Sequence, residues 1–308
     1  MAKKSPKFIL WYKDIILKDL PLVGGKNASL GEMFSKLTKK GINIPNGFVL
    51  TTTAFKYFVK VNKLEKKLKE VFEKFDPESI ESLQKTGKAA RNLILKAEFP
   101  EDLKKEIITA YQKLSKKYGK VDVDVAVRSS GVGEDLPSAS FAGQFETFLN
   151  VSGKENLLKA IKKCFASTFN DRVIAYRQEK KFPQSQYELS VGILKMVRSD
   201  LASSGVIFTL DTETGFPNVV LINSIFGVGE MIVKGLITPD EFYVFKPTLK
   251  KGYKAVIINN LGRKTKKYIY DRGGGLKEVN VPKRCQLKFS LTDDEVLTLA
   301  KWAIIIEN

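Results

Sequence analysis

Arg128 and the small residues that follow it are the first candidates for chemistry in this sequence. Residues 129–143 are rich in serine, glycine and alanine, so their backbone N–H groups can approach an anion closely. A guanidinium can place two parallel hydrogen bonds on phosphate oxygens, and bare backbone amides add further donors. The combination indicates a phosphate-binding loop. A long hairpin loop with a solvated arginine is the alternative.

Lys26 is the second candidate. It follows Gly24 and Gly25 and precedes residues that are compatible with a helix through Lys40. An ammonium beside the free N–H groups at a helix N-terminus is well placed for phosphate. The spacing is not that of a Walker P-loop. A surface lysine after a glycine turn therefore remains the alternative.

Histidine is absent from the 308 residues. This absence excludes serine–histidine and cysteine–histidine pairs, imidazole metal sites and a phosphohistidine carrier within the chain. Chemistry in these residues must use lysine, arginine, carboxylates, backbone amides or a bound metal.

The elements around Arg128 follow from the apolar pattern. Alternating valines from Val121 to Val127 predict a strand with one buried face, and Phe145–Val151 predicts a return strand. Residues 62–118 predict amphipathic helices, and Lys154–Lys180 predicts one long helix. Further strands are predicted at these positions: Leu189–Val197, Ala202–Leu210, Val219–Ser224, Ile237–Phe245, Ala255–Asn259 and Lys267–Tyr270.

This pattern predicts an α+β chain in two parts. Residues 1–186 mix helices and strands, with a helical insert at about 54–118, and residues 187–308 are mainly antiparallel sheet. Thr51 is expected to begin a helix, and Thr292 with Glu295 predicts a capping box for the last one.

Composition narrows the class of protein. The net charge of +18 suggests a nucleic-acid partner. However, residues 246–288 hold 13 basic and two acidic residues, and no nucleic-acid module is evident. Lysines along sheet edges, or a docking face, explain that segment instead. Two distant cysteines and no long apolar run predict a cytoplasmic protein with neither nucleic acid nor membrane as partner.

Six collinear motifs give the chain a resemblance to a known family. They resemble the N-terminal ATP-binding domain, of ATP-grasp type, in the phosphoenolpyruvate synthase (pyruvate, water dikinase) family. The resemblance covers nearly the whole chain, although pyruvate phosphate dikinase and rifampicin phosphotransferase share some of the elements. The motifs are Val23–Met33, Val127–Ser130, Glu134–Pro137, Ala139–Gln144, Lys195–Asp200 and Pro239–Val244.

The resemblance implies a role for each matching residue. Lys26 and Arg128 match the family's catalytic, phosphate-contacting lysine and arginine, and Arg128 would balance charge as the β–γ group departs. Ser129 belongs to the shared Arg-Ser-Ser element. The remaining cofactor-binding positions are Gly143 and Thr147, on the phosphate side, and Lys195, Met196 and Val197, which match the segment that lines adenine. Leu194 stands where many relatives carry glutamine.

The resemblance also implies cofactors and partners. ATP would donate its β-phosphate to a histidine on a separate carrier domain, AMP would leave, and the carrier would then visit a pyruvate-binding barrel domain. Mg²⁺ is expected, with its ligands beyond Asn308, so the second part is predicted to stop before the metal-ligand segment. No metal ligand is assigned in this chain, and Glu230 is a less favoured substitute. The chain alone is expected to be the inactive nucleotide-binding part.

Overall fold

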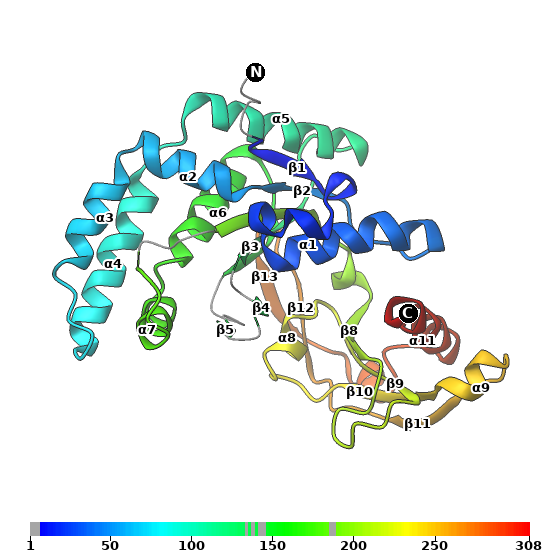
Figure 1. The fold of residues 1–308 in the computed structure, drawn as a ribbon. Helices are drawn as coiled ribbons and strands as arrows, with labels where there is room; N and C mark the ends of the chain where they lie inside the picture. The colour runs from blue at the N-terminus through cyan, green and yellow to red at the C-terminus, as the bar shows by residue number, and fades with distance from the viewer. Residues whose placement is uncertain (1–6, 133–134, 137–138, 141–145, 185–188) are drawn as a thin grey trace. The chain divides into compact units, whose positions relative to one another are not determined.

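The computed structural model describes residues 7–132, 135–136, 139–140, 146–184 and 189–308. The chain divides into two compact units, Met1–Met196 and Val197–Asn308. The first mixes helices with an antiparallel sheet, and the second is mainly antiparallel sheet (Figure 1). The mixed α and β architecture is therefore confirmed. The division follows Met196 rather than residue 186, because strand β7 (Leu189–Lys195) pairs on both sides within the first unit.

A five-stranded antiparallel sheet is the centre of the first unit. Strand β3 carries Arg128 and lies between β7 and β6, so it is paired along both edges. Arg128 stands directly opposite Gly192 of β7 on one side and Thr147 of β6 on the other. The strand order is β1 (Ile9–Trp11), β2 (Gly47–Leu50), β7, β3 (Val125–Gly131) and β6 (Thr147–Val151), and a separate pair is β4 (Asp135–Leu136) and β5 (Ala139–Ser140).

The alternating valines overstate the length of β3. The strand begins at Val125, and Val121 is 89% exposed. Side chains of the preceding helix satisfy the backbone of Val123: the Tyr111 hydroxyl donates to its carbonyl over 2.7 Å, and its N–H donates to the Ser115 hydroxyl over 3.1 Å. Before Val125, these bonds replace the hydrogen bonds that a neighbouring strand would make. An alternating sequence pattern cannot reveal that replacement.

Helices cover both faces of this sheet. Helix α1 (Leu20–Leu37) packs against β3 and β7 (Figure 1), while alternate residues of the same strands, such as Val127 and Ile193, join the main apolar core. Phe55 and Phe165 stack in that core with ring centroids 4.2 Å apart. The other helices of this unit are α2 (Thr52–Val61), α3 (Leu64–Phe72), α4 (Ile80–Lys96), α5 (Glu101–Lys117), α6 (Lys154–Ser167) and α7 (Asp171–Glu179), with the short 3-10 turns η1 (Tyr12–Asp14), η2 (Leu17–Asp19) and η3 (Thr38–Lys40).

Two helix predictions can be compared with the structure at their ends. Thr51 caps α2, because its hydroxyl accepts the N–H of Ala54 over 3.3 Å, as expected. The single helix predicted over Lys154–Lys180 is wrong: α6 ends at Ser167 and α7 begins at Asp171. The continuous apolar stripe concealed the break, because both helices turn apolar residues toward one core.

The second unit is built on a four-stranded antiparallel sheet whose one face is covered by helix α11 (Asp293–Glu307). Thr292 and Glu295 form the predicted capping box of that helix. The sheet order is β11 (Val256–Asn260), β10 (Asp240–Phe245), β9 (Val219–Phe226) and β8 (Ser203–Phe208), and the remaining elements are the hairpin β12 (Lys266–Tyr270) and β13 (Leu276–Asn280), helices α8 (Glu230–Val233), α9 (Lys246–Lys250) and α10 (Lys283–Gln286), and the turn η4 (Ser199–Leu201).

Two lysines of the basic segment 246–288 are buried in this unit. Lys264 pairs with Asp240, and both side chains are almost fully buried. Asp240 also accepts the N–H of Gly262 over 2.8 Å and the N–H and hydroxyl of Ser290, each over 2.7 Å. Lys246 donates to both carboxylate oxygens of Glu307, at 2.7 and 2.9 Å. Part of the positive charge of this segment therefore lies in buried ion pairs rather than on the surface.

No helix among the described residues is both long enough and apolar enough to cross a membrane.

Candidate functional site

Arg128 lies in the middle of β3 on the sheet face that α1 covers. Successive strand residues point to opposite faces, and the neighbours of Arg128, Val127 and Ser129, are buried while Arg128 is exposed. Gly192, the residue of β7 that pairs with Arg128, has no side chain. On the face of the sheet that carries Arg128, the space over Gly192 can therefore hold groups from α1 and η1. The charge of Arg128 acts on the nearby Tyr12 hydroxyl. Burial raises the pKa of this hydroxyl, and the positive charge of Arg128 partly offsets that rise.

Lys26 is brought to the same strand by a close backbone approach. Gly24 has a φ of +72° and interrupts the helical geometry of α1, so Lys26 lies in the first turn after the interruption. A Cβ on Gly24 would lie 2.4 Å from Ser130 Oγ and 2.7 Å from the Ser130 carbonyl oxygen. Only glycine fits this position without displacing β3. Lys26 and Arg128, the two predicted phosphate contacts, thus lie on segments that contact each other. The contact joins Gly24, two residues before Lys26, to Ser130, two residues after Arg128.

A buried polar network fixes this approach. Tyr12 donates to Asn27 Oδ1 over 2.7 Å, and Asn27 Nδ2 donates to the Val23 carbonyl and to Ser190 Oγ, each over 3.0 Å. Ser190 Oγ also bonds to the carbonyl oxygens of Val23 and, over 3.1 Å, of Ser130. All five residues are buried. The network joins α1 to β7 and β3, so the position of Lys26 is set by groups that lie beneath it.

The remaining phosphate-side predictions have different placements. Thr147 is exposed and lies directly across from Arg128, so its side chain shares the face of the guanidinium. Ser129 points to the opposite face, and its hydroxyl donates to the Glu146 carbonyl over 2.8 Å. Gly143 lies outside the described residues.

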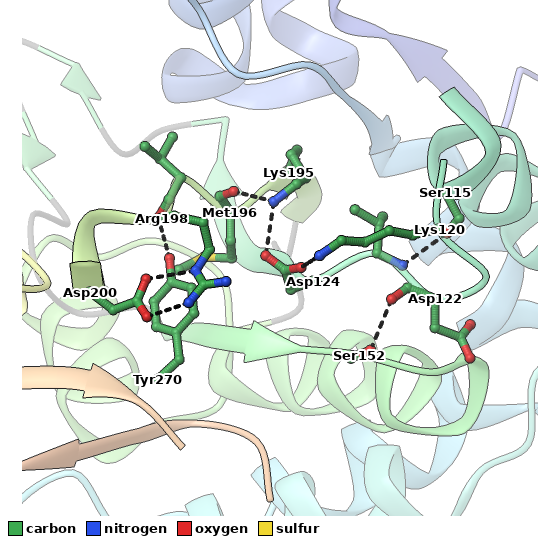
Figure 2. Close-up of polar contacts among 12 residues, drawn as sticks. Ser115, Lys120, Asp122, Asp124, Ser152, Lys195, Met196, Arg198, Asp200 and Tyr270 are labelled. Atoms are coloured by element: carbon green, nitrogen blue, oxygen red, sulfur yellow. Dashed lines mark hydrogen bonds and ion pairs between the residues drawn. The ribbon is translucent and has the colours of Figure 1, made fainter. Parts of the chain in front are cut away.

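Lys195 ends β7 and Met196 follows it, and Asp124 binds both (Figure 2). Lys195 Nζ donates to Asp124 Oδ2 over 2.8 Å and also to the Met196 carbonyl, and Met196 N–H donates to the Asp124 carbonyl over 3.0 Å. Lys120 binds the other carboxylate oxygen of Asp124 over 2.7 Å. Burial raises the pKa of Asp124, but the hydrogen bonds from Lys120 and Lys195 outweigh it and lower the pKa to about 2.

Val197 begins the second unit and has its own polar surroundings. Its carbonyl accepts the hydroxyl of Tyr270, and its side chain is 61% exposed. The next residue, Arg198, forms a two-pronged ion pair with Asp200, with Nε–Oδ1 and Nη2–Oδ2 distances of 2.8 and 2.7 Å (Figure 2). The Arg198 guanidinium also lies 5.5 Å from the centre of the Tyr270 ring. Val197 and Arg198 are therefore both linked to Tyr270 within the second unit.

The described residues show no cluster of side chains that would bind a metal ion by itself. They contain no group of three or more His, Cys, Asp or Glu side chains that could hold a metal ion. Glu230, the substitute weighed from the sequence, pairs with Lys234 over 2.5 Å. The carboxylates in the described part of the chain therefore form no all-protein metal site, whereas Mg²⁺ bound to a nucleotide needs only one or two of them.

The comparisons with known proteins identify the family. The profile of the family "Pyruvate phosphate dikinase, AMP/ATP-binding domain" matches residues 20–308. The chain belongs to this family. The resemblance predicted from the six motifs is thereby confirmed, and so is the ATP-grasp-like fold of the AMP/ATP-binding domain.

Similar proteins carry one name. The chain is 52% identical over 306 residues to phosphoenolpyruvate synthase of Aquifex aeolicus, 48% over 314 residues to that of Synechocystis, and 44% over 308 residues to that of Escherichia coli K12. These alignments cover 99–100% of this chain but only 36–39% of the relatives. The chain therefore spans little more than a third of the length of the curated relatives it matches.

Sequence reasoning missed the residues that position the candidate site. Tyr12, Asn27 and Ser190 have no spacing that links them, because they meet only after α1 docks on the sheet. Gly192 did carry a signal: an isolated glycine within a strand indicates close approach of another group. Asp124 was concealed within the alternating valines, where its position is that of an ordinary solvent-facing strand residue.

Proposed function

We propose that this chain is the ATP-binding, phosphoryl-donor domain of a phosphoenolpyruvate synthase, which converts ATP, pyruvate and water to phosphoenolpyruvate, AMP and phosphate. The observation that carries the proposal is the close backbone approach of Gly24 to Ser130, because Lys26 and Arg128 each lie two residues from it. The high identity to phosphoenolpyruvate synthases supports it. A related dikinase is the alternative within the family.

The proposed chemistry is electrostatic. Phosphoryl transfer depends mainly on positioning and on cations that stabilise charge on the phosphate oxygens. Arg128 would bind the phosphates with its guanidinium and balance charge as the bond to the leaving group breaks. Lys26 would add an ammonium beside the first N–H groups of its helix, which themselves favour an anion. Thr147, on the same face as Arg128, would donate its hydroxyl.

The acceptor must come from outside these 308 residues. The chain contains no histidine, so the carrier histidine of the proposed reaction would belong to another domain, and pyruvate would bind on a further barrel domain. AMP would leave from this chain after the transfer. Mg²⁺ would accompany ATP, with ligands from outside the described residues. A cytoplasmic location is proposed because both cysteines are free thiols.

A titration of the purified chain tests the proposal. ATP or AMP at about 100 times its Kd should stabilise the fold by about 2.7 kcal/mol, and Lys26→Ala or Arg128→Ala should abolish the stabilisation. Lys36→Ala is the matched control, because Lys36 lies on the same helix and pairs with Glu32 on its surface. Binding of nucleotide that is unchanged in both variants would refute the assignment. Salt-steep binding to DNA without stabilisation by ATP would support a nucleic-acid-binding protein instead.

A further inference from the structure

Asp124 connects the two strands that carry the proposed site. It directly precedes β3, four residues before Arg128, and on the β7 side it bonds to Lys195 and Met196. At about 3.3 Å per residue of extended chain, Asp124 and Arg128 are about 13 Å apart. One extended segment therefore carries a phosphate-side residue within β3 and, just before the strand begins, a residue bound to the segment proposed for the nucleoside.

The Lys195 side chain is folded back on its own strand end. Its ammonium donates to Asp124 and to the Met196 carbonyl, and it lies 5.9 Å from the centre of the Tyr118 ring. Only 15% of its side chain is exposed. An ammonium held in this way supports the backbone rather than reaching toward a ligand. Lys195 would therefore serve the nucleotide through its main chain.

Met196 is held at both of its backbone polar groups. Its N–H donates to the Asp124 carbonyl, and its carbonyl accepts the Lys195 ammonium. Both bonds depend on Asp124. The main-chain carbonyl of Asp124 accepts the Met196 N–H, and the carboxylate of Asp124 fixes the Lys195 ammonium that binds the Met196 carbonyl. Loss of the carboxylate would release Lys195 and remove one of the two restraints on Met196.

We propose that Asp124 is a positioning residue for the nucleoside part of the ligand: it holds the Lys195–Met196 segment in the shape that the nucleoside contacts, while Arg128, four residues farther along in β3, serves the phosphates. The inference rests on the proposed function. It predicts that the two ends of the nucleotide depend on two different residues, Asp124 and Arg128.

The test compares two ligands on the 308-residue chain by calorimetry. ATP has both a phosphate end and a nucleoside end, whereas inorganic tripolyphosphate has only the first. Asp124→Asn should weaken ATP binding tenfold or more and change the Kd of tripolyphosphate by less than twofold. Lys195→Met should do the same, because it removes the ammonium but keeps the main chain. Asp122→Asn is the matched control, since it removes the same charge two residues away from an exposed side chain.

Each outcome decides between the possibilities. Equal losses of ATP and tripolyphosphate binding would show a merely structural role and overturn the inference. So would an Asp124→Asn chain that binds ATP as the Asp122→Asn control does. If the unmodified chain binds neither ATP nor AMP, the proposed function fails and this inference fails with it. If the unmodified chain binds ATP but Asp124 makes no difference, only the inference fails.

Discussion

Gly192→Ala should test whether the buried network sets the docking of α1. A Cβ at position 192 would lie 2.4 Å from both the Tyr12 hydroxyl oxygen and Asn27 Oδ1, a separation that real Cβ atoms do not tolerate. Tyr12 is fully buried and Asn27 is 4% exposed, so neither can move into solvent. Either α1 shifts away from β7 or the Tyr12–Asn27 hydrogen bond breaks.

The magnitude follows from these two choices. Overpacking of a tight interior costs about 1–3 kcal/mol, and leaving a buried hydrogen-bonding group without a partner costs about 1–3 kcal/mol. Gly192→Ala should therefore lower the free energy of unfolding of the first unit by about 1–3 kcal/mol, whichever of the two occurs. Because α1 carries Lys26, the same substitution should weaken ATP binding, even though residue 192 has no side chain near the phosphates.

A double-mutant cycle gives the sharper measurement. Tyr12→Phe removes one of the two atoms that the new Cβ would meet, so Gly192→Ala should cost at least about 1 kcal/mol less in that background. Urea unfolding followed by Trp11 fluorescence reports on the first unit, and Trp302→Phe in every variant removes the other tryptophan. Strictly additive costs, or a Gly192→Ala cost below about 0.5 kcal/mol, would refute the close contact of Gly192 with Tyr12 and Asn27.

Three further predictions concern the ion pairs. Asp240→Asn should destabilise the second unit by about 3–5 kcal/mol, because it leaves the buried Lys264 ammonium without a counter-charge; urea unfolding followed at Trp302 checks this, and an effect below about 1 kcal/mol contradicts it. Lys246→Met keeps the apolar stem but removes the bonds to Glu307, and a loss of about 1–3 kcal/mol is expected in the same assay; an unchanged midpoint would show that the pair is dispensable. The Asp124 carboxyl has a pKa lowered from 3.8 to about 2, so its contribution is complete well above pH 4 and is lost as the pH falls toward 2. The stability difference between the unmodified chain and Asp124→Asn should therefore shrink between about pH 5 and about pH 2, and a difference that grows on acidification would contradict the sign.

The sequence predicted the elements better than it predicted how they meet. Strand positions in the second unit followed from apolar runs and turn residues, and the capping box at Thr292 was correct because capping is a local interaction. The start of β3 was wrong because the hydroxyls of Tyr111 and Ser115, which replace its ladder, come from an earlier helix. Local patterns contain no information about such partners.

The same limit applies to the site. Lys26 and Arg128 were predicted because each stands beside glycine or serine, a local signal for anion binding. That their segments approach each other depends on Gly24 and Ser130, more than 100 positions apart in the chain. The number of charges in a segment also fails to predict which of its side chains are exposed. The composition of residues 246–288 predicts a solvated segment, but Lys246 and Lys264 in it are buried in ion pairs.

The central position of β3 has a consequence for how the site can move. A strand that is hydrogen-bonded along both edges exposes its amides only when the sheet itself opens, whereas edge strands and chain ends open locally at far lower free energy. The amides of Val125–Arg128, which β6 and β7 flank on both sides, should therefore be among the last in the first unit to exchange with heavy water. The two ends of the proposed nucleotide site would then keep a fixed spacing for as long as the unit stays folded, and adaptation to the ligand would be left to the segments that approach this strand.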